Sequence, residues 1–363
     1  METAFGRGAP FTVGNEEELF LVDGGGGLAP VAAAVLDALG ADAQSAGHEA
    51  YAAEIELRSA PAPNAGAAVE ELATLRTRAA EAAAGSVASL LAAGLHPRGR
   101  LGDAELVDAE RYRRVLGDMR GLIQRTPECA VHVHVGMPSA EAAVRAFNGL
   151  RRWLPLLIGL TAASPFWFGV DSGLASARAA QVRAYPGRGV PRAVRDLDDW
   201  GRACADAAAG GGPDDYTMLW WDVRLHPRLG TVEVREMDAQ SLLGDLAAVA
   251  ALIQGLARCE AQPGQPPPPP VEVIQWSSFR AMRDGLAAEI AHDRELLPLP
   301  EVGRAAVRLA AAGAREAGSE AEIGGVERII AAGNGADRQR RAHRAGGMAR
   351  LIEVLLAETA APP

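Results

Sequence analysis

Apolar and polar residues alternate with a period of two in four short segments of the chain. This alternation predicts β-strands that bury one face and leave the other polar. Prolines bound two of the segments, because Pro61 follows the second and Pro138 follows the third. The predicted strands are 11–22, 52–58, 130–136 and 230–236.

Segments rich in alanine and leucine separate and follow these strands, and they predict helices. Ser139 has the usual chemistry of a helix N-cap, and Glu141 lies in the first turn that follows it. The apolar run 154–170 is too short and too interrupted by prolines to span a membrane, so it predicts a buried helix and turn. The other predicted helices cover 66–93, 241–259 and most of the chain after Pro298, with a break at 333–335.

Segment 262–270, which ends in five prolines, has low complexity. A polyproline stretch is a semi-rigid spacer and could separate two domains. The part after it is nearly all helix, and covering a sheet suits it better than folding alone. We therefore expect one catalytic domain over 1–363, with 262–270 crossing its surface.

The polar faces of the four predicted strands carry an unusual set of side chains. Residues i and i+2 share one face of a strand. Val and Leu side chains occupy the opposite faces, together with Glu17 on the first strand. The polar faces hold Glu16 and Glu18, then Glu54, Glu56 and Arg58, then His132 and His134, and finally Thr231, Glu233 and Arg235.

Several carboxylates and two imidazoles on one face would repel one another or lose hydration unless cations lie among them. Taken alone, a Glu-x-Glu or His-x-His strand is more often a solvated edge or a structural feature than a metal site. On all four predicted strands these residues follow the same period of two, and this joint occurrence favours a shared site. Oxygen ligands with few nitrogens suit Mg²⁺ or Mn²⁺ better than zinc.

The formal net charge of −10 argues against non-specific binding to nucleic acids, which requires a basic face. The sequence contains no lysine, so arginine, backbone N–H groups or a metal must neutralise any bound phosphate. Three scattered cysteines form neither a disulfide framework nor a zinc motif. With no evident signal peptide, we expect a cytoplasmic protein that binds neither nucleic acid nor membrane.

Several blocks resemble the carboxylate–amine ligases, the family of type 2 glutamate–cysteine ligase-like proteins. They occur in family order over almost the whole chain, and the WWDVR and TVEVR blocks together are quite specific. Asn15 departs from the pattern, because an apolar residue is expected there. The blocks include GNEEELFLVD at 14–23, AEIELRSAP at 53–61, VHVHVG at 131–136, WWDVR at 220–224 and TVEVREMDAQ at 231–240.

The resemblance implies an α+β, glutamine-synthetase-like fold, in which a curved antiparallel sheet forms a funnel flanked by helices. It also implies ATP and divalent metal ions, and it points to a homodimer. Arg235 matches the arginine that faces the transferred phosphate, with Glu233 beside it as a metal ligand. Glu49 and Glu56 are separated by an odd number of positions, so on one regular strand they would point to opposite faces. We therefore expect a bulge to bring Glu49 to the face of Glu56. The implied metal ligands are Glu16, Glu18, Glu49, Glu56, His132 and Glu233, and the candidate nucleotide or substrate contacts are His134, Arg178, Arg183 and Arg224.

The implied activity is ATP-dependent amide formation through an acyl phosphate, with glutamate as the carboxylate and cysteine or another amine as the acceptor. The reading from residues alone leaves two alternatives open. One is a phosphagen-kinase-like phosphotransferase, which would release ADP without inorganic phosphate. The other is a non-catalytic metal-binding protein, whose ligands would only stabilise the sheet.

Overall fold

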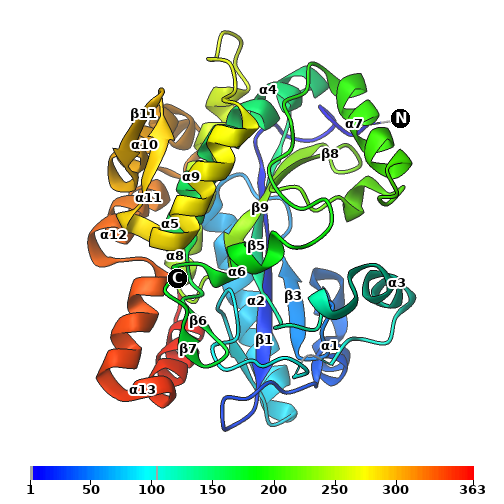
Figure 1. Ribbon diagram of the computed structural model, residues 1–363, viewed down its shortest axis with the longest axis vertical. Coiled ribbons are helices and arrows are strands. Elements are labelled where there is room, and N and C mark those ends of the chain that lie inside the picture. The colour runs from blue at the N-terminus through cyan, green and yellow to red at the C-terminus, as the bar shows by residue number, and fades with distance from the viewer. Residues whose placement is uncertain (1–2, 104) are drawn as a thin grey trace.

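A computed structural model describes residues 3–103 and 105–363, and its centre is a seven-stranded sheet (Figure 1). Every pairing in this sheet is antiparallel. The order along the sheet is β2-β3-β1-β5-β9-β8, and β4 pairs with the end of β1. The strands are β1 (Val13–Val22), β2 (Ala46–His48), β3 (Glu54–Arg58), β4 (Ser89–Leu91), β5 (Ala130–Gly136), β8 (Val223–His226) and β9 (Thr231–Asp238).

The apolar face of this sheet forms the main core. Side chains such as Leu19, Ile55 and Val133 are fully buried there, as the alternation predicts. The helix α8 (Leu243–Glu260) is buried on almost all sides, because it lies between the sheet and an outer layer of helices. The other helices that contact this face are α2 (Ala65–Gly85), α4 (Ala140–Leu150) and α5 (Leu154–Thr161).

The C-terminal third forms the outer layer, and Figure 1 shows it on one side of the sheet in yellow to red. It begins with α9 (Val271–Asp284) and the hairpin of β10 (Glu289–His292) and β11 (Glu295–Pro298). Gly333, at φ 96°, ends α12, and the Asn334 side chain caps α13, so the predicted break is confirmed. The remaining helices of this layer are α10 (Leu299–Ala317), α11 (Glu320–Ile323), α12 (Gly325–Ala332) and α13 (Gly335–Thr359).

Segment 262–270 connects α8 to α9 and is largely exposed, and apolar residues of both helices belong to the main core. That the chain forms one domain remains our prediction. Within the described part of the chain, no helix is long and apolar enough to cross a membrane.

The remaining α-helices are α1 (Ala32–Leu39), α3 (Glu110–Met119), α6 (Ala177–Val182) and α7 (Leu197–Ala209). Residues of α1 and α7 belong to the main core, whereas α3 and α6 carry side chains on the polar side of the sheet. A short hairpin of β6 (Phe166–Trp167) and β7 (Val170–Asp171) precedes α6.

The fold class and the four predicted strands are confirmed, but one predicted helix is too long. Helix α2 ends at Gly85, and residues 89–91 form β4 instead of continuing it to 93. Val87, at φ 58°, reverses the chain between the two elements. Leu90 and Leu91 suit a helix and a buried strand equally well, so only the pairing with β1 decides between them.

Glu17 is the one charged residue that β1 directs into the core, where it meets Arg76 of α2. Arg76 donates from Nε and Nη2 to the Glu17 carboxylate at 2.6–3.0 Å, and both side chains are almost fully buried. Its guanidinium also donates to the carbonyls of Gln240, Ser241 and Thr359. One arginine therefore joins β1, α2, the segment before α8 and the end of α13.

Replacing Arg76 with methionine is expected to lower the free energy of unfolding by about 3–5 kcal/mol, because it leaves a buried carboxylate without its partner. Urea denaturation measures this loss. Arg78 provides the control, since it lies two residues further along α2 and pairs with Asp42 at the surface. Arg78→Met is expected to cost less than about 1 kcal/mol, and equal losses in the two variants would contradict the role given to Arg76.

Candidate active site

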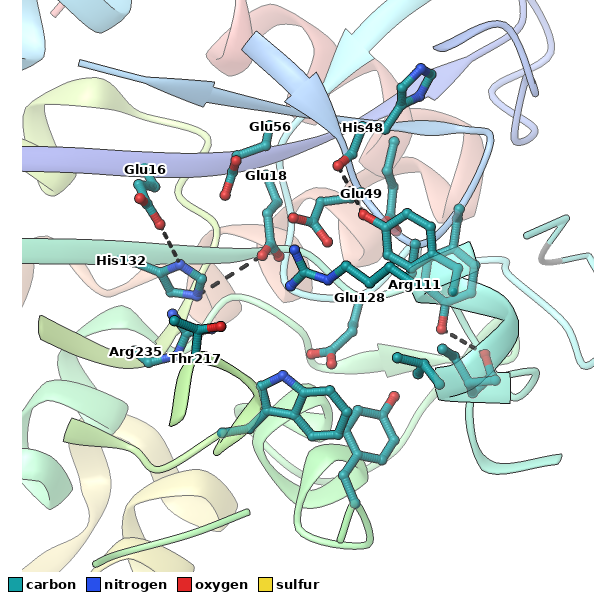
Figure 2. A pocket seen from close by; sticks show the side chains of 18 of the residues that line it. Glu16, Glu18, His48, Glu49, Glu56, Arg111, Glu128, His132, Thr217 and Arg235 are labelled. Carbon is teal, nitrogen blue, oxygen red and sulfur yellow. Dashed lines mark hydrogen bonds and ion pairs between the residues drawn. The ribbon is translucent and has the colours of Figure 1, made fainter. Parts of the chain in front are cut away.

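The polar face of the sheet forms the floor of a cavity of about 430 Å³ (Figure 2). Strands β1, β3, β5 and β9 supply the floor, and α3 and the loops after β2 and before β8 supply the walls. Glu16, Glu18, Glu56, His132 and Arg235 all line this cavity. The period of two therefore brings together side chains that are more than 200 residues apart.

Strand register places the acidic side chains of β1 between those of its neighbours. Glu16 lies opposite His132 of β5 on one side and Arg58 of β3 on the other. Glu18 lies opposite Glu56, so two carboxylates face each other across neighbouring strands. The Nδ1 atom of His132 is 3.1 Å from Glu16 Oε2, and its Nε2 atom is 3.9 Å from Glu18 Oε1.

Glu49 reaches the same cavity without the expected bulge, so that expectation was wrong. The chain forms a separate strand, β2, and Gly47 of this strand lies opposite Glu56. Glu49 is two residues beyond Gly47 and therefore points to the same side as Glu56. Glu49 follows β2 and Glu56 belongs to β3, so their spacing along the chain does not decide which face Glu49 occupies.

A bulge does occur, but in β9. Val133 pairs with Val234, whereas Val131 pairs with Met237, so two residues of β9 oppose His132 alone. The extra residue reverses the alternation. Met237 thus enters the core, while Asp238 turns to the polar side and accepts hydrogen bonds from Ser164 and Ser176.

Three groups of side chains have ligand atoms close enough to share a metal ion. Within each group, the ligand atoms lie within 4.8 Å of one another. Glu16 and Glu56 each belong to two groups, so the three form a continuous row along the sheet. The groups are Glu18, Glu49 and Glu56; Glu16, Glu56 and His132; and Glu16, His134 and Glu233.

The electrostatics of the cavity fit bound cations. Burial raises the pKa of Glu18 to about 7, and it also raises the pKa values of Glu49 and Glu56 above their usual range. Neighbouring carboxylates add to each of these shifts. A divalent cation would offset the free-energy cost of burying these charges, because it favours the charged form of each carboxylate. The donor set of carboxylates and imidazoles suits Mg²⁺ or Mn²⁺.

Glu233 differs from the other carboxylates because it already has cationic partners. Burial alone would raise its pKa, but Arg235, His134 and Arg224 outweigh that effect and lower the pKa. The guanidinium of Arg235 pairs with Oε1 of Glu233, and Arg224 donates to Oε2 at 2.8–2.9 Å. His134 Nε2 lies 3.4 Å from Glu16 and 3.6 Å from Glu233 and forms no hydrogen bond of good geometry with either, which leaves it able to bind a ligand.

The arginines predicted to contact nucleotide or substrate have different surroundings. Arg178 and Arg224 line the cavity, and Arg178 pairs with Glu128 at 2.7 Å. Arg183 is not among the lining residues. Its guanidinium pairs with Asp222 at 2.8 Å and Glu236 at 3.2 Å, below the bulge of β9. The geometry gives Arg183 a structural contact, and its binding of nucleotide stays a prediction.

Several cavity residues lie outside the predicted set. Figure 2 shows Arg111 of α3 pointing toward Glu18 and Glu49, with Glu128 on the opposite side. Trp220 lines the same cavity and packs edge-on against Tyr185. The WWDVR block signals Trp220 in the sequence. Arg111 and Glu128 lie on a helix and a loop whose sequences show no pattern that links them to the sheet.

Comparison with known proteins finds, over nearly the whole chain, the family that the sequence blocks resemble. Residues 12–354 match the model of glutamate–cysteine ligase family 2. A Rubrobacter xylanophilus protein provisionally named glutamate–cysteine ligase 2-3 is 37% identical over 367 residues, covering 99% of this chain and 100% of the relative. A Haloquadratum walsbyi protein named glutamate–cysteine ligase is 32% identical over 360 residues, covering 96% of each chain.

Two solved structures share the fold at only 13% sequence identity. A Francisella tularensis glutamate–cysteine ligase, solved in complex with AMP, matches with a TM-score of 0.71 over 97% of this chain and 89% of that one. A bifunctional glutathione synthetase from Pasteurella multocida also matches with a TM-score of 0.71, over 97% of this chain and 52% of that one. At this identity the likeness establishes the fold, and it confirms the predicted fold class.

Glu56→Gln is expected to weaken Mn²⁺ binding by tenfold or more, because Glu56 belongs to two of the three groups and its charge attracts the cation. Isothermal titration of the protein with Mn²⁺ measures the affinity without requiring turnover. Glu128→Gln is the control, since Glu128 lines the same cavity but pairs with Arg178 and belongs to none of the three groups. Unchanged Mn²⁺ binding in the Glu56 variant would refute the metal assignment.

Proposed function

Because this chain belongs to glutamate–cysteine ligase family 2, we propose that it is an ATP-dependent ligase that joins a carboxylate to an amine. Glutamate is the expected carboxylate and cysteine or a related amine the expected acceptor. The observation that carries the proposal is the family match over 12–354 on a sheet whose polar face gathers several glutamates, His132 and Arg235 in one cavity. An ATP-consuming enzyme with free thiols is expected in the cytoplasm.

The proposed reaction has two steps. A substrate carboxylate oxygen attacks the γ-phosphorus of ATP, and the bond from that phosphorus to the ADP oxygen breaks. The amine nitrogen then attacks the acyl carbon, the bond from this carbon to the phosphate oxygen breaks, and the nitrogen loses a proton. The products are the amide, ADP and inorganic phosphate.

The carboxylates of the three groups and the imidazoles of His132 and His134 would hold Mg²⁺ or Mn²⁺. When bound, these ions supply positive charge that offsets the charge of the ATP phosphates. His134, which we first assigned to nucleotide or substrate, lies in one of these groups. We therefore extend the proposed ligand set of Glu16, Glu18, Glu49, Glu56, His132 and Glu233 to include it.

Arg235 is the proposed contact to the transferred phosphoryl group. Its guanidinium is planar and can donate two parallel hydrogen bonds to an anion. Glu233 holds it from one side, and the backbone N–H of Arg235 donates to the carbonyl of Asp222 at 2.9 Å. Both ends of the residue are thus fixed before substrate arrives, which is what stabilisation of developing charge requires. Arg178 and Arg224 are proposed to assist from the cavity wall.

The proposed activity predicts inorganic phosphate release from ATP that depends on Mg²⁺, glutamate and an amine together. Phosphate release is measured with amines added one at a time, and mass spectrometry identifies the amide product. Release of ADP with a phosphorylated acceptor but without inorganic phosphate would show phosphotransfer instead. Metal binding without turnover for any substrate pair would contradict the ligase proposal.

Arg235→Lys is expected to lower kcat by about 100-fold or more while changing the KM for ATP much less. A lysine ammonium keeps the charge but cannot make two hydrogen bonds in one plane. Steady-state kinetics measures both constants. Arg113→Lys on the exposed surface of α3 is the control and is expected to leave kcat unchanged, whereas retained activity in the Arg235 variant would mean that this arginine is structural.

A further inference from the structure

Arg188 lies in the wall of the cavity, and its contacts to carboxylates are long. Its side chain is only 5% exposed, and it lines the cavity together with Tyr185 and Trp220. Its Nη2 atom is 3.5 Å from Glu236 Oε2, and its Nε atom is 3.9 Å from Asp222 Oδ1. Both distances exceed the about 3.2 Å that is usual for a hydrogen bond. Nε thus has no hydrogen-bond partner among the described residues.

The other buried arginines of the cavity are held more closely. Arg178 and Arg224 lie 2.7 and 2.8 Å from their carboxylate partners, and Arg235 pairs directly with Glu233. These three guanidiniums already neutralise a carboxylate at short range. Within the described part of the chain, Arg188 is therefore the one buried arginine of this cavity without a close carboxylate partner.

Arg183, rather than Arg188, makes the short contacts to the two carboxylates that they share. Its guanidinium is 2.8 Å from Asp222 and 3.2 Å from Glu236. Burial also raises the pKa of Asp222 to about 7, so this carboxylate is only partly charged near neutral pH. The two arginines together then carry more positive charge than the two carboxylates neutralise. An anion that binds in the cavity beside Arg188 would balance this surplus.

Backbone contacts fix Arg188 in the cavity wall. It lies between Gly187 and Gly189, whose φ angles of 67° and 129° favour glycine. The N–H of Asp222 donates to the carbonyl of Gly189 at 3.0 Å, and the N–H of Arg235 donates to the carbonyl of Asp222. Arg188 and the proposed phosphoryl contact Arg235 both line the cavity and are tied through Asp222, which suits one substrate that spans them.

We propose that Arg188 is a specificity-determining residue that binds a substrate carboxylate, one that takes no part in amide formation. This inference rests on the ligase function proposed above. A guanidinium can donate two parallel hydrogen bonds to a carboxylate, and the exclusion of water beside Tyr185 and Trp220 strengthens such a pair. The ATP phosphates are expected at the cation sites on the sheet floor, so the anion at the wall is a carboxylate. The enzyme therefore selects substrates with a non-reacting carboxylate, such as the α-carboxylate of an amino acid.

Pairs of ligands that differ by one carboxylate test this role. Glutamate has an α-carboxylate that 4-aminobutyrate lacks, and cysteine differs from cysteamine in the same way. Isothermal titration in the presence of Mg²⁺ and ADP measures all four affinities without turnover. Wild-type protein is expected to bind at least one amino acid about tenfold or more tightly than its decarboxylated partner, and Arg188→Met is expected to abolish this preference. The pair that responds identifies the substrate whose carboxylate Arg188 binds.

The same measurement separates binding from a purely structural role. Arg195→Met is the control, because Arg195 is 76% exposed and 3.7 Å from Asp199, and it is expected to leave all four affinities unchanged. Thermal unfolding is followed for each variant. Arg188→Lys keeps the charge inside the fold and is expected to retain part of the preference.

Several results would overturn the role given to Arg188. They are a wild-type protein without the preference, an Arg188→Met variant that keeps it, an equal loss of affinity for both members of a pair, and a loss of affinity for ADP instead. Phosphate release with 4-aminobutyrate and cysteamine as fast as with glutamate and cysteine would also overturn it, while leaving the ligase proposal intact.

Discussion

Carboxylates that face each other across neighbouring strands repel, and the repulsion grows where water is excluded. In this protein Glu18 lies opposite Glu56, and Glu49 joins them from the end of β2. Such an arrangement is costly unless positive charge is supplied close by. Arg178 and Arg235, which both line the cavity, supply part of that charge, but burial still raises the pKa values of the three carboxylates.

On the opposite face of the sheet, the protein neutralises a buried carboxylate with one of its own side chains. Glu17 is buried there, but Arg76 meets its carboxylate with two donor atoms and uses its other donors on three backbone carbonyls. This contact gathers the beginning, middle and end of the chain around one buried charge. The two faces of β1 thus differ in one respect: the charge on the core side is fully paired, while the charge on the cavity side is left available.

The bulge of β9 affects both the packing of the core and the surroundings of the candidate site. Arg235 is on the same side as Glu233 by regular alternation, and the extra residue opposite His132 then turns the next side chain in that series, Met237, into the core. Asp222 and Glu236 lie beneath this point and are held by Arg183. Arg235 is therefore anchored through both its side chain and its backbone, and the proposed phosphoryl contact depends on packing that extends well beyond the cavity.

The sequence by itself determined the four main strands, the division of their faces and most of the candidate site, because side-chain direction in a strand alternates strictly. It could not determine features that depend on pairing between distant segments. Three features follow from register: the separate strand that precedes Glu49, the strand in place of a helix at 89–91, and the side to which Asp238 points. Arg111 and Glu128 enter the site from a helix and a loop, and only tertiary packing brings such residues to a sheet, since no local periodicity encodes that approach.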